Sequence, residues 1–161
     1  MSARKRYWLL KTEPEVFSWQ DLVEADGQTT FWDGVRNYQA RNFMRDDMRP
    51  GDGVLWYHSR GKEPAVVGQA EVASRAEPDP TQFDPASPYH DPKSPVDDPR
   101  WCGVRVKAVR ALAAPVTLAA IKAEPGLAEM PLVQRGQRLS VQPVTADQWR
   151  AVLRLGGIKT R

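Results

Sequence analysis

A proline-rich stretch at residues 77–100 limits the folds open to this chain more than any other feature. Seven of the 14 prolines lie within it. Proline fixes φ and has no N–H to donate, so neither a helix nor a central strand can run through this spacing. A loop of this length inside a compact domain is usually either functional or disordered. Phe83 and Tyr89 favour an ordered loop anchored on the body of the protein, because their rings gain nothing from staying in water.

Short apolar runs on both sides of this loop predict β-strands. The predicted strands cover residues 7–10, 54–57, 65–72, 101–112 and 139–141. The second and third runs are close enough in sequence to pair as a hairpin. In the fourth run the alternation of apolar and charged residues slips by one position, which predicts a bulge near Ala108.

Four short helices are predicted from residues that cap helix N-termini. The caps are Ser18, Asn37, Thr117 and Thr145, and the helices that follow them cover residues 19–24, 38–48, 118–123 and 146–155. At 161 residues the chain is most simply one domain, residues 1–161, of the mixed α/β (α+β) class. We expect a curved sheet or small β-barrel with short peripheral helices.

The overall charge permits nucleic-acid binding without demonstrating it. The net charge of +3 comes from 23 basic and 20 acidic side chains, which is only mildly basic. A single cysteine, Cys102, excludes an internal disulfide and suits a reducing compartment. No apolar run is long enough for a signal peptide or a membrane span. We therefore expect a soluble, cytoplasmic protein with no membrane partner.

The segment at residues 31–42 gathers aromatic rings, a glycine turn, two arginines and two asparagines. A flat ring beside an amide and a guanidinium is what a protein needs to stack a planar base, read its edge and hold its phosphate. Trp32 could instead be a core residue, as most tryptophans of small domains are. Its neighbours Asp33, Arg36 and Asn37 would be costly to bury, which favours a base-binding pocket.

The basic side chains near this segment are candidates for phosphate contacts. Arg36 and Arg41 lie closest to Trp32 in sequence, and Arg60 and Lys62 follow in the predicted hairpin loop. Arg45 and Arg49 more simply form the solvated face of a helix, paired with neighbouring aspartates.

The end of the second predicted strand offers further pocket candidates. Trp56 and Tyr57 alternate, so one of them faces the core, and we expect Tyr57 to face outward with Ser59. His58 could form a hydrogen-bonding wall of a pocket or could be a satisfied, half-buried histidine. The remaining tryptophans are assigned to packing: Trp8, Trp19, Trp101 and Trp149.

Signatures of enzymes are missing from the sequence. It contains no glycine-rich phosphate loop, no nucleophile elbow and no His or Cys pair with metal-ligand spacing. We therefore expect no catalytic residue, no metal and no cofactor. A rival interpretation is a small hydrolase that uses Lys11 or His58 with Glu13.

Several segments, in order along the chain, resemble EVE-domain proteins. The most specific match is Trp-Asp-Gly-Val-Arg-Asn-Tyr-Gln-Ala-Arg-Asn at residues 32–42, which follows the family's opening strand and Thr-Glu-Pro turn at residues 7–14. The other matching segments are residues 51–59, 66–68, 84–89, 131–132 and 139–144. The resemblance covers essentially the whole chain, in a short stand-alone form typical of bacteria.

The resemblance implies a PUA-like fold, kinship to YTH domains and a modified base of DNA as ligand, such as 5-methylcytosine or 5-hydroxymethylcytosine flipped from the stack. It implies Trp32 as a wall of an aromatic cage, with Lys11 and Thr12 beside it, Asn37 and Ser59 reading the base edge, and Tyr89 closing the cage. The full set of candidate pocket residues is Lys11, Thr12, Trp32, Val35, Asn37, Tyr57, His58, Ser59 and Tyr89. Two alternatives are a PUA-like reader of modified tRNA or rRNA and a hydrolase of modified nucleosides, as the related ASCH domains suggest.

Overall fold

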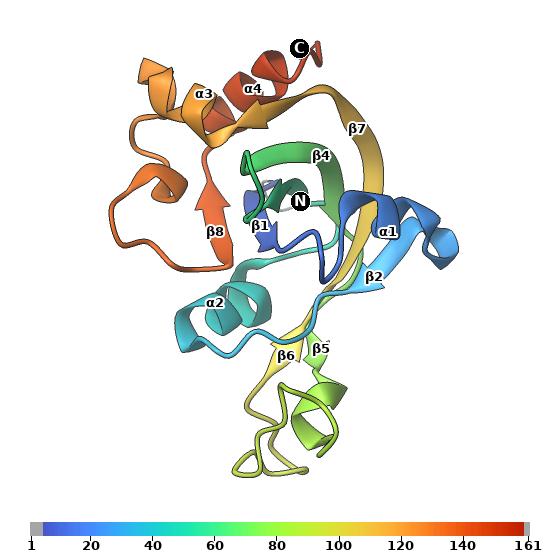
Figure 1. The fold of residues 1–161 in the computed structure, drawn as a ribbon. Helices are drawn as coiled ribbons and strands as arrows, with labels where there is room; N and C mark the ends of the chain where they lie inside the picture. Colours follow the sequence, from blue (N-terminus) through green and yellow to red (C-terminus); the bar gives the residue numbers. More distant parts are fainter. Residues whose placement is uncertain (1–4, 160–161) are drawn as a thin grey trace.

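A curved sheet with short helices around it forms the body of the protein, whose computed structural model describes residues 5–159 (Figure 1). The strands are β1 (Tyr7–Thr12), β2 (Thr29–Phe31), β3 (Gly53–His58), β4 (Ala65–Val72), β5 (Glu77–Pro78), β6 (Cys102–Gly103), β7 (Arg105–Thr117) and β8 (Val141–Val144). The α-helices are α1 (Trp19–Glu24), α2 (Tyr38–Asn42), α3 (Leu118–Ala123) and α4 (Ala146–Leu155). Short 3₁₀ turns occur at Asp26–Gln28, Pro80–Phe83, Pro125–Leu127 and Pro131–Val133. None of the helices in residues 5–159 is long and apolar enough to cross a membrane.

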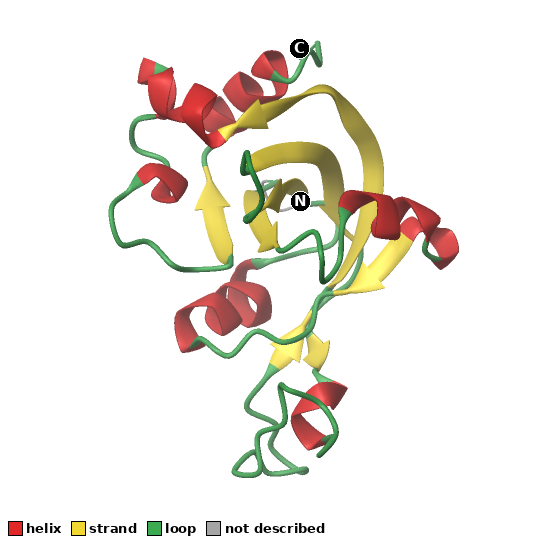
Figure 2. Cartoon of the chain, viewed as in Figure 1, coloured by secondary structure: helices red, strands yellow, loops and turns green. Residues whose placement is uncertain are grey.

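Six strands form the main sheet in the order β2-β7-β4-β3-β1-β8, and β5 pairs with β6 in a separate ribbon. Neighbouring strands are antiparallel except β1 and β3, which run parallel. The long strands β4 and β7 bend around β1, and the helices lie at the periphery of the curve (Figures 1 and 2). The predicted α+β class with a curved sheet is therefore confirmed.

Irregular pairing helps the sheet to curve. Between β4 and β7, Gln69 pairs with Arg110 but Ala70 pairs with Ala108, so Val109 is an extra residue. This is the bulge predicted near Ala108, and a bulge increases the local bend and twist of a strand. Further shifts in pairing lie between Val66 and Gly68 of β4 and between Trp56 and Tyr57 of β3.

The central strands are buried on both faces, and this overturns the expectation for Tyr57. Trp56 belongs to one buried cluster and Tyr57 to another on the opposite face. Tyr57 is only 2% exposed, and burial raises its pKa to about 12. The expectation of an outward Tyr57 was wrong because it assumed that one face of the sheet is solvated, whereas helices and turns cover both. The tryptophans assigned to packing, Trp8, Trp19, Trp101 and Trp149, are all buried or half-buried.

Element boundaries differ from the predictions at several places; the strand predicted for residues 101–112, for example, is divided into β6 and β7, and β7 runs on to Thr117. The helix predicted to run to Met48 is α2 followed by a π-helical turn at Phe43–Asp47. The last strand, predicted for residues 139–141, covers Val141–Val144 and includes Pro143. Proline is tolerated there because β8 is an edge strand of the sheet. The caps predicted at Ser18 and Thr145 are both present, and each forms a capping box.

The proline-rich loop extends away from the sheet between β5 and β6 (Figure 1). Its anchor is Gln82, which is fully buried. The Gln82 amide donates to the carbonyl oxygens of Asp79 (2.7 Å) and Trp101 (2.8 Å), and its Oε1 accepts from Ser94 Oγ (2.6 Å) and Trp101 N (3.1 Å). The loop is thus held mainly by buried polar contacts, whereas Tyr89, one of the two expected anchors, is 37% exposed.

Candidate functional site

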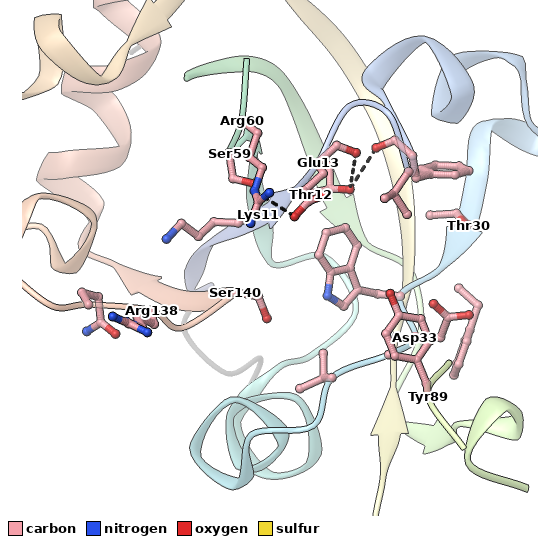
Figure 3. Close-up of a pocket in the computed structure, with 17 residues that line it drawn as sticks. Lys11, Thr12, Glu13, Thr30, Asp33, Ser59, Arg60, Tyr89, Arg138 and Ser140 are labelled. Carbon is pink, nitrogen blue, oxygen red and sulfur yellow. Dashed lines mark hydrogen bonds and ion pairs between the residues drawn. The ribbon is translucent and has the colours of Figure 1, made fainter. Parts of the chain in front are cut away.

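A cavity of about 730 Å³ opens where β1 and β3 end. Because these strands are parallel and in register, with Thr12 opposite His58, the residues that follow them emerge at the same edge. The Ser59 N–H donates to Thr12 O at 2.9 Å and closes this edge. The cavity is lined by Lys11, Thr12, Glu13, Val16, Phe17, Thr30, Phe31, Trp32, Asp33, Gly34, Val35, Ser59, Arg60, Tyr89, Gln137, Arg138 and Ser140 (Figure 3).

Trp32 is both a core residue and a pocket residue. It is 9% exposed, and its ring meets that of Trp56 edge to face, with centroids 5.3 Å apart and planes at 85°. The Trp32 N–H donates to Val104 O at 2.8 Å. The two interpretations of Trp32 are therefore compatible, since the core fixes a ring that also lines the cavity.

The turn after Trp32 brings Tyr89 of the long loop to the cavity. Gly34 has a φ of +77°, and a Cβ placed on it would lie 2.8 Å from the Tyr89 ring. The Tyr89 ring therefore rests on the backbone of this turn, and only glycine allows both the conformation and the approach. Asp79, fully buried at the start of the loop, accepts from Gly34 N at 2.9 Å.

Charged groups are distributed unevenly around the cavity. Lys11 and Arg138 lie on one side, whereas Asp33 and Tyr89 lie on the other (Figure 3). Burial lowers the pKa of Lys11, while burial and then the charge of Asp79 raise the pKa of Asp33. Arg60 pairs with Glu13 at 3.1 Å, but both side chains are well exposed, so this pair is weak. Lys11 and Arg138 have no ion-pair partner among the described residues.

Six of the predicted pocket residues line the cavity: Lys11, Thr12, Trp32, Val35, Ser59 and Tyr89. Three do not. Tyr57 is in the core, and Asn37 caps α2 by accepting from Ala40 N at 3.0 Å. His58 Nε2 accepts from Trp19 N at 3.0 Å, which attaches the start of α1 to the end of β3. The geometry thus favours the satisfied, half-buried His58 over the pocket wall.

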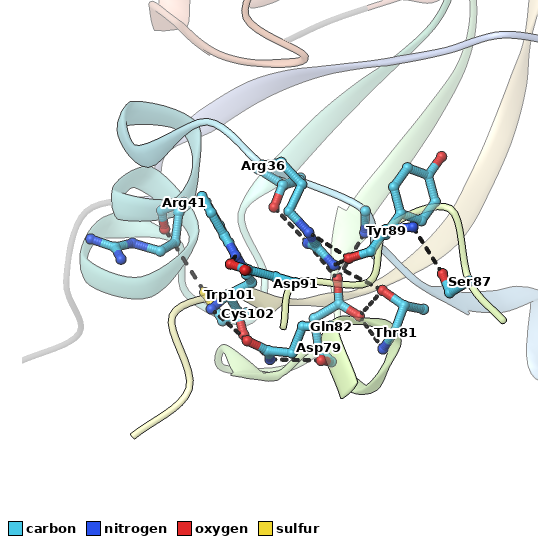
Figure 4. A network of polar contacts seen from close by, with 12 residues as sticks. Arg36, Arg41, Asp79, Thr81, Gln82, Ser87, Tyr89, Asp91, Trp101 and Cys102 are labelled. Atoms are coloured by element: carbon cyan, nitrogen blue, oxygen red, sulfur yellow. Dashed lines mark hydrogen bonds and ion pairs between the residues drawn. The ribbon is translucent and has the colours of Figure 1, made fainter. Parts of the chain in front are cut away.

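Two of the predicted phosphate ligands are engaged within the protein. All five N–H groups of the Arg36 guanidinium have acceptors in the protein (Figure 4). Arg41 donates to Arg100 O and to the Asn42 side chain, and its guanidinium lies 4.6 Å from the centre of the Tyr38 ring. Neither lines the cavity, so the structure favours an internal role over a phosphate contact for both. Of the other two candidates, Arg60 lines the cavity and Lys62 is exposed on the β3–β4 loop.

Several residues that line the cavity were not predicted from the sequence. Glu13, Asp33 and Gly34 adjoin predicted residues and could have been added from adjacency alone. Arg138 and Ser140 gave no such signal, because they reach the cavity only through pairing of the β8 region with β1. Lys11 N donates to Ser140 O at 2.9 Å and marks this contact.

The described part of the chain offers no set of side chains that could bind a metal ion. Residues 5–159 contain no group of three or more His, Cys, Asp and Glu side chains placed to hold an ion. Cys102 is a half-buried free thiol, and burial raises its pKa. The groups that line the cavity are aromatic rings, polar side chains and cationic side chains.

Comparison with known proteins gives consistent similarities. The family model described as "EVE domain" matches residues 6–155. Human thymocyte nuclear protein 1 is 43% identical over 166 residues, which span 92% of this chain and 73% of that protein. The crystal structure of human THYN1 in complex with DNA containing 5-methylcytosine superposes with a TM-score of 0.90 at 40% identity, covering 97% of this chain and all of that one. A crystal structure from Pseudomonas syringae gives a TM-score of 0.88 at 45% identity, covering 93% of this chain and 99% of that chain.

Proposed function

The chain belongs to the EVE domain family, and from this premise we propose that it binds nucleic acid by holding one modified base between Trp32 and Tyr89. The observation that carries the proposal is the cavity that both rings line. It is supported by the 40% identical human structure, which was solved with DNA containing 5-methylcytosine. We propose 5-methylcytosine in DNA as the first ligand to test, with 5-hydroxymethylcytosine as the second.

The cavity suits a base taken out of the helix stack. Extrusion of a base costs a few kcal/mol, and stacking on an aromatic side chain returns about 1–3 kcal/mol per base. Ser59 and Asp33 are the polar lining residues that we propose read the base edge. The Thr12 hydroxyl donates to Phe17 O at 3.0 Å and therefore supports the wall instead.

Phosphate contacts must supply the rest of the binding free energy. We propose Lys11, Arg60 and Arg138 for this role in place of Arg36 and Arg41. Lys11 and Arg138 lie on the side of the cavity opposite Asp33 and Tyr89 (Figure 3), so a base at the aromatic side would place its backbone near them. Lys62 stays a prediction for a more distant phosphate.

We propose binding without turnover, in the reducing interior of the cell. The single, free Cys102 agrees with that compartment. Incubation with the free modified nucleoside tests the hydrolase alternative, because any product would reveal turnover. A preference for the same modified base in RNA over DNA would favour the RNA reader, since the 2′-OH distinguishes the two.

The test is an anisotropy titration of labelled duplexes that are identical except for one cytosine, 5-methylcytosine or 5-hydroxymethylcytosine. We expect tighter binding to one modified duplex, and Trp32→Ala should weaken it by about 5- to 150-fold, the equivalent of about 1–3 kcal/mol. Tyr7→Ala is the matched control, because Tyr7 stacks on Trp149 at the other end of β1. Equal affinity for all duplexes, or an unchanged affinity in Trp32→Ala, would reject the proposal.

A further inference from the structure

We infer that Arg36 is a positioning residue that holds Tyr89 in place as the second wall of the cavity and so sets the width of the base site. The inference rests on the proposed function for its ligand. It concerns an arginine that lies outside the cavity and that the sequence alone had suggested for phosphate.

The Arg36 guanidinium joins the segment that carries Trp32 to the loop that carries Tyr89. Its Nε and NH2 groups both donate to the Tyr89 carbonyl oxygen, at 3.0 and 2.7 Å. Its NH1 group donates to Val35 O at 2.8 Å and to Asp79 Oδ2 at 3.0 Å, and NH2 also donates to Thr81 Oγ1 at 3.0 Å. Figure 4 shows these contacts converging on one side chain.

The acceptor Asp79 is as firmly held as its donor. It is fully buried, and it accepts from Gly34 N at 2.9 Å and from Thr81 N and Oγ1 at 2.8 and 2.6 Å. Burial alone would raise the pKa of Asp79, but these hydrogen bonds and that from Arg36 outweigh burial and lower it. Asp79 therefore stays charged and keeps Arg36 in its fork-like orientation.

A stack of rings and guanidinium groups supports Arg36 on its other side. The Arg36 guanidinium lies 5.3 Å from the centre of the Trp101 ring, which stacks on Tyr38 at 4.8 Å and 24°. Arg41 lies over Tyr38 in turn, and Trp101 Nε1 donates to Asp91 Oδ2 at 2.8 Å. Arg36 is consequently fixed from two directions, through Asp79 and through this stack.

Tyr89, by contrast, has little else to hold it. It is 37% exposed, and its N–H donates only to the side chain of Ser87, two residues earlier, at 3.1 Å. Its ring lies against Gly34 and near the Arg36 guanidinium, 5.7 Å from the ring centre. The chain is next attached at Asp91, which bonds to Gln82 O and to Trp101 Nε1, so the two hydrogen bonds from Arg36 are the contacts that hold Tyr89 itself.

Arg36→Lys separates this role from charge. Lysine keeps the positive charge beside Asp79 but cannot form the bidentate contact with the Tyr89 carbonyl. We expect about a tenfold loss of affinity for the modified duplex, with little change for the unmodified duplex. In a double-mutant cycle, Arg36→Lys should cost less than about twofold once Tyr89→Ala is present, because the two changes remove the same wall.

The inference would be overturned if Arg36→Lys lowered affinity by the same factor with and without Tyr89→Ala. A salt dependence of binding that weakens by about one phosphate equivalent in Arg36→Gln would also overturn it, because that result would make Arg36 a phosphate ligand. If Trp32→Ala lowers affinity and Arg36→Lys does not, the positioning role fails while the proposed function stands.

Two further measurements test the inference: a second variant that displaces the Tyr89 ring, and a readout on the free protein that needs no ligand. Gly34→Ala displaces the Tyr89 ring from the other side, since the new Cβ would lie 2.8 Å from it, and its loss of affinity should likewise depend on Tyr89. In the free protein, the NMR signals of the Tyr89 ring, assigned with Tyr89→Phe, should move toward solvent-averaged positions in Arg36→Lys. Unchanged ring signals would overturn the inference even if no modified duplex binds.

Discussion

A single side chain in this protein can serve both packing and the cavity. Trp32 packs on Trp56 in the core and lines the pocket, so the choice between core and site that its sequence context posed was too narrow. His58 differs, because it was a candidate for the pocket but serves only the fold: its side chain accepts a hydrogen bond from the start of α1. In both cases the residue type predicted a place in the pocket, but the tertiary contacts of the side chain decided its role.

His58 should make stability depend on pH. Its Nε2 must be neutral to accept from Trp19 N, and burial lowers its pKa from 6.5, with Glu15 acting in the opposite direction. The unfolded chain therefore takes up this proton more readily than the folded protein. The stabilisation is complete above about pH 6.5 and is lost as the pH falls toward the lower, folded pKa. Urea unfolding between about pH 7.5 and pH 5 measures it.

The matched variant for this prediction is His58→Gln, whose amide oxygen can accept the same hydrogen bond without titrating. The difference in unfolding free energy between the two proteins should change across this pH range. A parallel loss of stability in both would show that other groups cause the pH dependence.

The position of Gly68 should not tolerate even the single methyl group of alanine. A Cβ at this position would lie 2.4 Å from the Trp19 ring, so α1 would have to move away from β4. We expect Gly68→Ala to lower the free energy of unfolding by about 1–3 kcal/mol. Gly126→Ala is the control, because its Cβ would meet nothing closer than 3.8 Å, and it should stay within about 0.5 kcal/mol of wild type. Equal stabilities of the two variants would contradict the packing argument.

At the scale of elements, the long loop is the part that most needs tertiary contacts. Its prolines exclude regular structure, and its order comes from the buried contacts of Gln82 and from Arg36. We expect Gln82→Ala to leave Ser94 and Trp101 N without their partner, at a cost of about 1–3 kcal/mol. Hydrogen exchange should accelerate in residues 84–99 and stay unchanged in α4.

Gln20→Ala serves as the control for this loop prediction. Gln20 is exposed on α1 and bonds only to Glu24, one turn away, so it should change stability by less than about 0.5 kcal/mol. Unaltered exchange in the loop of Gln82→Ala would mean that Gln82 is not its anchor.

Helix starts and strand alternation were predictable because they depend on neighbours in sequence. The caps at Ser18 and Thr145 act over three residues, and the bulge beside Ala108 showed as a slip in alternation. The edge strand β8 was placed too early because Pro143 argues against a strand unless the strand is known to lie at an edge. That knowledge comes only from the sheet order.

At the scale of the whole molecule, the charge that matters is local. A net charge of +3 is small, yet Lys11, Arg60 and Arg138 from three distant segments line one cavity. We expect Arg138→Ala to lower DNA affinity for modified and unmodified duplexes alike. The slope of log affinity against log salt concentration should fall by about 0.7–0.9, the value for one lost phosphate contact.

Arg154→Ala is the control for this charge, because Arg154 is exposed on α4, which does not line the cavity. It should leave the salt slope unchanged. An equal effect of both variants would reduce the interaction to attraction by overall charge, and no effect of Arg138→Ala would remove Arg138 from the interface.

The sequence by itself determined the class of fold, most of its elements, the family resemblance and the segment around Trp32 as the candidate site. These depend on interactions within a few residues, namely capping, alternation and the restrictions of proline and glycine. Six of nine predicted pocket residues line the cavity for the same reason, since most of them adjoin that segment or the end of a strand.

Only the tertiary structure decided which arginines are free to bind and which hold the protein together. Arg36 and Arg41 are adjacent to the site in sequence but find acceptors in residues 79–100, whereas Arg138 arrives beside Lys11 because the β8 region pairs with β1. A guanidinium bonds to whatever acceptors lie within about 3 Å, and that distance is set by the path of the whole chain. Local sequence cannot supply it.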